Sequence, residues 1–121
     1  MVMVTKISGI TLGVTSMSRS LRFYRDILGL KILYGDESSS FCSFDVGGSY
    51  LNLQLSTEVG TRWGRVIFYC DDVDGLHSRL VSSGCDCSSP SDAPWGERYF
   101  HLNDLDGHEL SFAKPLHPKR E

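Results

Sequence analysis

The amino-acid sequence repeats one order of elements twice, and this internal repeat limits the possible folds more than any other feature. In each half, alternating apolar residues precede an amphipathic helix that stops at a glycine, Gly29 or Gly84. Three strands are expected after each glycine, so each half has the order β-α-β-β-β. Because neither half could easily bury its sheet alone, we expect modules of about residues 7–55 and 65–113 to form one domain over residues 1–121.

Alternation and helical spacing predict the elements of the first half. Ser16 is expected to cap a helix over residues 17–28, because serine side chains accept hydrogen bonds from the first turn. Gly29 is expected to end this helix in a left-handed conformation. The predicted strands span residues 7–14, 31–34, 41–46 and 50–55.

The second half is predicted to follow the same plan. A strand over residues 65–70 precedes a helix that begins at Asp72 or Asp74 and stops at Gly84. Residues 85–94 are rich in Ser, Asp and Pro and are expected to form a loop with one short strand near its start. The residues of the helix that are expected to face the core are Leu76, Leu80 and Val81.

The last hairpin is predicted in most detail. Strands over residues 98–103 and 108–112 are joined by a turn in which the aspartates accept bonds from backbone amides two residues on and Gly107 takes a positive φ. Alternation gives this hairpin an apolar face and a polar face. The apolar face carries Phe100, Leu102, Leu110 and Phe112, and the polar face carries Tyr99, His101, Glu109 and Ser111.

Composition excludes some classes of function. A formal net charge of −3 and the lack of a basic stripe argue against a nucleic-acid partner. The N-terminal residues lack the apolar stretch of a secretory signal, and no run of about 20 apolar residues is present for a membrane span. We therefore expect a cytoplasmic protein with no nucleic-acid and no membrane partner.

The four cysteines are expected to be free thiols. Cys85 and Cys87 are separated by one residue, whereas zinc ribbons and redox motifs use two. Disulfides are not expected in a protein that carries no secretory signal. Cys70 is predicted to be a core residue, while Cys85 and Cys87 are predicted to lie in a loop.

Two stretches resemble the vicinal oxygen chelate superfamily: LRFYRDILGL at residues 21–30 and PWGERYFHLNDLDGHEL at residues 94–110. This superfamily includes glyoxalase I, bleomycin-resistance proteins, fosfomycin-resistance enzymes and extradiol dioxygenases. The resemblance implies an α+β fold in which two tandem β-α-β-β-β modules form a curved mixed sheet around a cup, with the helices on the outer face. It also implies a small-molecule ligand in the cup and a homodimer.

The enzymes of this family commonly hold a divalent metal with His and Glu side chains on the strands that face the cup. Carried over to this sequence, the family positions fall at Gly9, Arg65, Ser111 and either Asn52 or Gln54. None of these is a usual metal ligand, and Arg65 brings a positive charge to the place of a cation. The resemblance therefore implies that the family metal is missing, and we expect neither metal nor cofactor.

Parity along the strands selects the candidate site residues. His101, with Glu109 and Tyr99, is the candidate for proton transfer, because an imidazole titrates near neutral pH. The alternative is a histidine bonded to Tyr99 or Glu109 with no chemical role. Arg65 either clamps an anionic ligand or forms an ion pair with Glu109. The candidate ligand-binding residues are Thr11, Asn52, Gln54, Arg65, Tyr69 and Ser111.

Three kinds of function stay open at this point. The first is a binding or sequestration protein similar to the bleomycin-resistance branch, without the family metal. The second is a metal-independent lyase, isomerase or hydrolase that uses His101 and Arg65, with a metal-dependent glyoxalase- or dioxygenase-like enzyme as a lesser alternative. The third is a module whose dimer or partner surface matters more than its cup.

Overall fold

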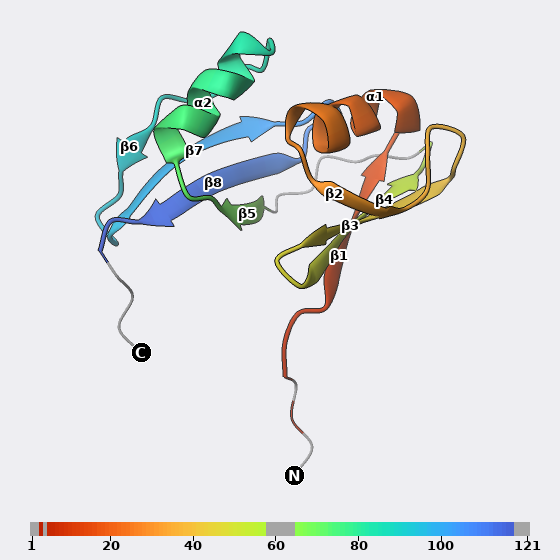
Figure 1. Cartoon of the computed structure of the whole chain (residues 1–121), viewed down its shortest axis with the longest axis horizontal. Coiled ribbons are helices and arrows are strands. Elements are labelled where there is room, and N and C mark those ends of the chain that lie inside the picture. Colours follow the sequence, from red (N-terminus) through yellow and green to blue (C-terminus); the bar gives the residue numbers. More distant parts are fainter. Residues whose placement is uncertain (1–2, 4, 58–64, 118–121) are drawn as a thin grey trace. The chain divides into compact units, whose positions relative to one another are not determined.

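The computed structural model describes Met3 and residues 5–57 and 65–117 of the chain (Figure 1). The chain divides into two compact units, an N-terminal module up to Gly60 and a C-terminal module from Thr61 onward. Each module has the order β-α-β-β-β that the internal repeat predicts, and each forms a four-stranded mixed sheet with one helical segment. The α+β class is therefore confirmed.

The N-terminal sheet has the strand order β1-β4-β3-β2, with β1 parallel to β4 and the other neighbours antiparallel. The four strands agree with the predicted ones to within two residues at each end. The first strand begins at Gly9 and not at residue 7. The strands are β1 (Gly9–Val14), β2 (Lys31–Tyr34), β3 (Phe41–Val46) and β4 (Ser49–Leu55).

The helix of this module begins as predicted but does not stay regular. Ser16 caps α1 (Met17–Leu21) by accepting a hydrogen bond from the Arg19 amide at 3.4 Å. The chain then widens into the π-helical segment η1 (Arg22–Ile27) and ends at Gly29, which has φ 79°. The predicted helix over residues 17–28 is thus present, but its second half is π-helical and does not keep the α-helical spacing that was expected. The wider turn leaves the adjacent Phe23 and Tyr24 both buried, with their rings edge to face at 4.9 Å.

The C-terminal sheet repeats this topology as β5-β8-β7-β6, again with one parallel pair, β5 and β8. The predicted short strand lies near the end of residues 85–94, not near their start, where Cys87 forms only an isolated bridge with Leu102. The elements are β5 (Arg65–Tyr69), α2 (Val73–Ser82), β6 (Ser91–Asp92), β7 (Glu97–Asn103) and β8 (Glu109–Pro115).

Helix α2 lies on one face of this sheet, against β7 and β8 (Figure 1). Asp72 is its N-cap and accepts a hydrogen bond from the Gly75 amide at 3.0 Å. Leu80 is fully buried as predicted, whereas Val81 is 48% exposed, so its predicted place in the core was wrong. The ring of His77 packs edge to face on the ring of Phe100, with their centroids 5.2 Å apart.

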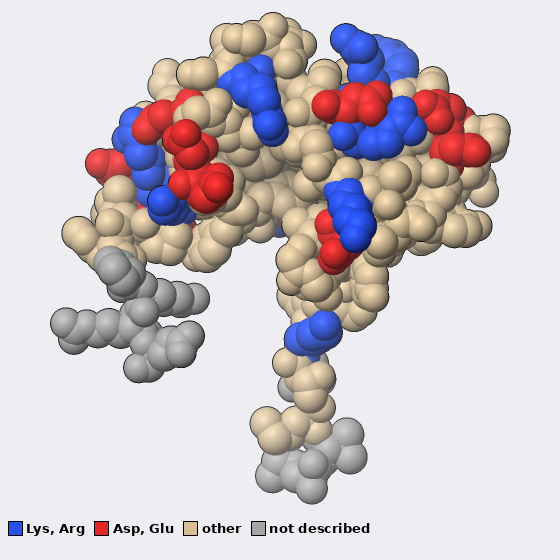
Figure 2. All heavy atoms as spheres, viewed as in Figure 1, with Lys and Arg blue, Asp and Glu red and all other residues tan. Residues whose placement is uncertain are grey.

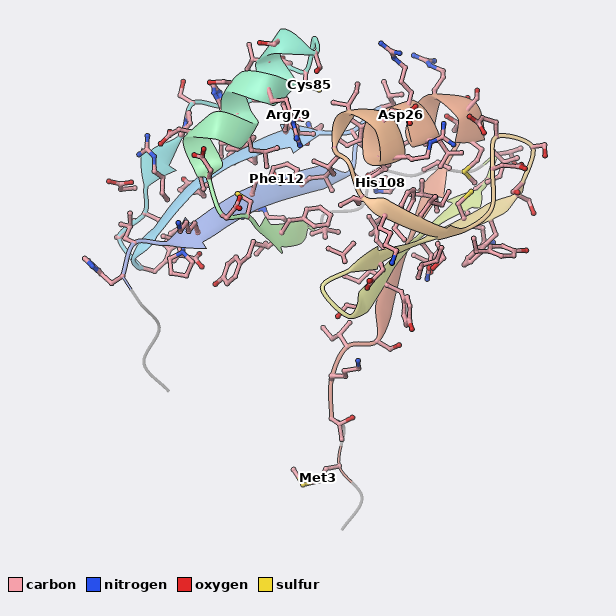
Figure 3. The ribbon with its side chains drawn as sticks, viewed as in Figure 1. Met3, Asp26, Arg79, Cys85, His108 and Phe112 are labelled. Atoms are coloured by element: carbon pink, nitrogen blue, oxygen red, sulfur yellow. The ribbon has the colours of Figure 1, made fainter. Side chains whose placement is uncertain are left out.

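Stacked phenylalanines form the core beneath α2. The rings of Phe68 and Phe100 lie on either side of Phe112, at 5.4 and 5.2 Å. Figure 3 shows Phe112 on the side of the sheet that carries α2. This packing decides which side of each strand faces the helix, and the other side carries the polar residues.

The turn between β7 and β8 has the predicted chemistry. Asp104 Oδ1 accepts hydrogen bonds from the amides of Asp106 at 3.0 Å and His108 at 2.8 Å. Gly107 has φ 85°, a conformation that side chains with a Cβ rarely adopt. The turn therefore sets the register of the hairpin, in which His101 lies opposite Ser111.

Charged side chains cover the outer surface near α2 and β6 (Figure 2). The Arg98 guanidinium bonds Asp74 of α2 through two nitrogens and Asp92 of β6 through the third, at 2.9 to 3.1 Å. This bonding holds the pKa of the Asp74 carboxyl below its usual range. The same arginine thus ties a helix and an edge strand to β7.

The Asp72 cap gives a test of the fold. Asp72→Ala should lower the free energy of unfolding by about 1 kcal/mol, because the first turn of α2 loses the acceptor for the Gly75 amide. Urea titration followed by circular dichroism measures the change. Asp71→Ala is the control, since Asp71 accepts a bond from Lys114 through its backbone oxygen, which alanine keeps. Equal effects of the two variants would contradict the role of the cap.

Candidate functional site

The face of the C-terminal sheet opposite α2 is called the polar face here. Parity and register place on it Arg65, Ile67 and Tyr69 of β5, Glu109, Ser111 and Ala113 of β8, and Glu97, Tyr99 and His101 of β7. Cross-strand neighbours on this face include Arg65 with Glu109, and Ser111 with both Ile67 and His101. All six candidates that the sequence places in this module lie on the polar face. Five of them offer charged or hydrogen-bonding groups, and Tyr99 offers its ring.

His101 and Ser111 form the centre of the polar face. Ser111 is only 5% exposed. His101 Nδ1 and Ser111 Oγ are buried, and neither has a hydrogen-bond partner within the described residues. The predicted alternative, a bond from His101 to Tyr99 or Glu109, therefore does not involve Nδ1. Buried polar atoms are nearly always paired in proteins, so two such atoms on facing residues identify a place where a partner would be stabilised.

Arg65 and Glu109 form the ion pair that the sequence left open. Arg65 Nε donates to Glu109 Oε2, and the side chains are 37% and 26% exposed. Arg65 thus has a carboxylate partner in its own module. A guanidinium that is already bonded to a carboxylate is a weaker anion clamp than an unpaired one.

Three rings stack along β7. Trp95 lies on Tyr99 at 5.8 Å, and Tyr99 lies on His101 at 6.2 Å, with interplanar angles of 29° and 26°. We call these three residues the aromatic stack. Trp95 remains 66% exposed.

Glu97 joins the aromatic stack to Tyr69, and the sequence analysis missed it. Its carboxylate accepts hydrogen bonds from the Tyr69 hydroxyl and from Trp95 Nε1, the second at 2.9 Å. The hydrogen bond to Glu97 raises the pKa of Tyr69 above its ordinary value. The missed signal was the alternation Glu97-Tyr99-His101, which extends one step beyond the predicted start of the strand at residue 98.

The candidates of the N-terminal module lie on the face of its own sheet that does not carry the helix. Asn52 Nδ2 donates to Thr11 Oγ1 at 3.2 Å, and Gln54 is exposed on the same strand face. Register makes Asn52 the counterpart of Ser111, because Gly9 lies opposite Tyr50 just as Arg65 lies opposite Glu109. The predicted cup stays a prediction.

The thiols give no reactive centre. All four cysteines are free, as predicted, but Cys70 is only half-buried and not a core residue. Burial raises the pKa of each thiol, which lowers its thiolate fraction at neutral pH. In the part of the chain that the structure describes, no three His, Cys, Asp or Glu side chains are grouped so as to hold a metal ion.

Comparison with known proteins establishes the family. Residues 6–112 match the Glyoxalase/Bleomycin resistance protein/Dioxygenase superfamily, and the chain belongs to it. The chain is 29% identical over 116 residues to the "Metallothiol transferase FosB" of Staphylococcus haemolyticus, which covers 89% of this chain and 82% of that protein. None of the helices in the described part of the chain is long and apolar enough to cross a membrane.

Solved structures share the fold. A putative glyoxalase family protein from Bacillus anthracis matches with a TM-score of 0.82 and 15% identity, covering 95% of this chain and 98% of that one. The fosfomycin resistance protein FosX from Listeria monocytogenes matches with a TM-score of 0.78 and 20% identity, covering 92% and 93%. The superfamily match over residues 6–112 confirms the recognition made from residues 21–30 and 94–110.

The Glu97 contact predicts a change in a titration. Glu97→Gln should lower the pKa of Tyr69 toward its ordinary value of about 10, because the amide keeps the bond but removes the negative charge. The ultraviolet absorbance of tyrosinate follows the titration, and Tyr69→Phe identifies the signal that belongs to Tyr69. An unchanged titration in Glu97→Gln would contradict the contact.

The raised pKa of Tyr69 makes the free energy of unfolding depend on pH. The folded chain holds the Tyr69 proton more tightly than the unfolded chain, so this bond contributes stability below pH about 10. The contribution is lost as the pH rises through the folded pKa.

Proposed function

We propose that the protein binds a small molecule on the polar face of its C-terminal module. The single observation that carries the proposal is the pair of buried, unpartnered atoms His101 Nδ1 and Ser111 Oγ on facing residues. An unsatisfied buried polar group costs roughly 1 to 3 kcal/mol. A ligand that supplied partners for both atoms would recover this free energy on binding.

The other candidates have roles around this centre. Tyr99 offers a ring beside His101, and Tyr69 offers a second ring across Ala113. The ion pair of Arg65 and Glu109 orders the end of the face where β5 and β8 begin. Thr11, Asn52 and Gln54, which parity selected, stay proposed ligand-binding residues of the N-terminal module. The homodimer that the resemblance implies and the cytoplasmic location also stay proposals.

The residues present do not fit the metal that the name of the staphylococcal relative implies. At the family positions stand Gly9, Arg65 and Ser111, of which Arg65 is bonded to Glu109. A Cβ at Gly9 would lie 3.0 Å from the Tyr50 oxygen and 3.2 Å from its Cβ, so a larger side chain there requires Tyr50 to shift. The proposed function therefore uses no metal ion.

A metal-independent lyase, isomerase or hydrolase is the weaker reading of the same face. That mechanism needs Arg65 to stabilise an oxyanion, and the bond to Glu109 competes with this role. Binding through His101, Ser111 and the neighbouring rings needs no free guanidinium.

A second candidate is a fosfomycin-modifying activity. The observation that favours it is the similarity to FosB over 89% of the chain. This relative is named a metallothiol transferase and FosX a fosfomycin resistance protein, so the corresponding reaction would add a thiol to fosfomycin. The C–S bond would form as one C–O bond of the epoxide breaks, and the proton of the thiol would pass to the released oxygen. The lack of ligands at Gly9, Arg65 and Ser111 weighs against it.

Ser111→Ala tests the binding proposal through two effects of opposite sign. Removing the unpartnered hydroxyl should leave the free energy of unfolding unchanged or raise it by about 1 kcal/mol. The same change should weaken a ligand of this face by about threefold to tenfold, because one hydrogen bond is lost. Fragments that shift the backbone signals of β7 and β8 in ¹H–¹⁵N spectra serve as ligands, and urea unfolding measures stability.

Ser88→Ala is the matched control in the same module. Its hydroxyl accepts a hydrogen bond from the His101 amide at 2.9 Å, so this variant should be less stable. The binding proposal fails if no fragment shifts the signals of β7 and β8. It fails equally if Ser111→Ala binds those fragments as tightly as the original chain does.

A separate assay distinguishes binding from transfer. Fosfomycin is incubated with the protein, a small thiol such as L-cysteine and Mg²⁺ or Mn²⁺, and ³¹P spectra are recorded. We expect no new phosphorus signal, because the positions of the metal ligands are occupied by Gly9, Arg65 and Ser111. A thiol adduct that forms only with the protein present would replace the binding proposal with the transferase.

A further inference from the structure

Glu97 lies between two exposed aromatic side chains on the polar face. One of its oxygens accepts from Trp95 Nε1 and the other from the Tyr69 hydroxyl. Trp95 is 66% exposed and Tyr69 is 58% exposed. The carboxylate thus joins two exposed rings from different strands into one patch.

We infer that this end of the polar face is a subsite for an organic cation with a flat aromatic body, such as an N-alkylpyridinium group. The inference rests on the proposed function and names the chemical class of its ligand. The flat body would stack on the outer face of Trp95, whose other face lies on Tyr99. The positive charge would lie near the Glu97 carboxylate and the two rings.

The hydrogen bonds of Glu97 make these rings better partners for a cation. Trp95 and Tyr69 both point a polar hydrogen at the carboxylate, which leaves their π faces for a ligand. Donation to a negative charge polarises each ring and makes its face more negative, which strengthens attraction to a cation. Because these bonds already hold the side chains, binding orders few new rotamers.

The neighbouring basic residues of the strands point elsewhere. Arg98 follows Glu97 in sequence and bonds Asp74 and Asp92 on the α2 side of the sheet. Lys114 precedes Pro115, which lies opposite Glu97, and donates to the Asp71 oxygen. Alternation thus sends these two cations to the helix side and leaves the carboxylate and the rings on the polar face.

Charge is tested with two probes of the same shape, N-methylpyridinium and toluene. The indole N–H signal of Trp95 in ¹H–¹⁵N spectra is followed during each titration, and Trp95→Phe assigns it, since the chain has only two tryptophans. We expect N-methylpyridinium to bind at least about threefold more tightly than toluene, the range given by a cation–π contact at an exposed site.

Glu97→Gln is the decisive variant, because glutamine keeps an acceptor for both donors and removes only the charge. It should weaken N-methylpyridinium by about threefold or more and leave toluene within about twofold. Asp86→Asn is the control, because it also removes one negative charge but does so far from Glu97. Asp86 precedes Cys87, which pairs with Leu102 at the other end of β7. This variant should change neither affinity.

Each outcome decides the inference. Equal binding of the two probes, or an unchanged N-methylpyridinium affinity in Glu97→Gln, removes the preference for a cation. A Trp95 signal that neither probe shifts removes the subsite. In both cases the proposed function would stand if Ser111→Ala still weakened fragments on β7 and β8. A charge-dependent shift at Trp95, with no effect of Ser111→Ala, would instead overturn the centre at His101 and keep the cation subsite.

Discussion

The packing of Phe68, Phe100 and Phe112 under α2 is the constraint on which the C-terminal module depends. Successive side chains on a strand point to opposite faces, so burying these rings on one side also decides what the other side carries. A shift of one residue would place Phe112 on the polar face and Ser111 against the helix. The turn at Asp104 and Gly107 prevents this shift by fixing the register of the hairpin.

The same constraint acts in the N-terminal module with different residues, and the corresponding faces of the two sheets carry different side chains. Asn52 and Ser111 are counterparts in register, yet Asn52 is bonded to Thr11 whereas Ser111 Oγ has no partner among the described residues. Gly9 and Arg65 begin the first strands of the two modules, and neither is a metal ligand. The repeated fold is thus kept while the chemistry of its faces is different in each half.

Local signals made most of the fold predictable. Ser16, Asp72, Gly29 and Gly107 act through bonds and dihedral angles within a few residues of themselves, so the sequence reveals them. The π-helical segment and the exposure of Val81 depend on how a helix fits its sheet, which spacing does not report. In the site, parity placed His101 and Ser111 on one face, but it could not predict the contacts of Glu97, because Tyr69 reaches this residue from another strand.

His101 connects the two features that define the polar face. Its ring ends the aromatic stack, while its Nδ1 lies buried across from Ser111. A ligand placed on Trp95 would reach this centre only by extending past Tyr99, across ring spacings of 5.8 and 6.2 Å. The ion pair of Arg65 and Glu109 lies farther still, since β8 rises about 3.3 Å per residue from Glu109 toward Pro115. A compact ligand therefore meets either the carboxylate of Glu97 or the hydrogen-bonding pair, and only an elongated one meets both.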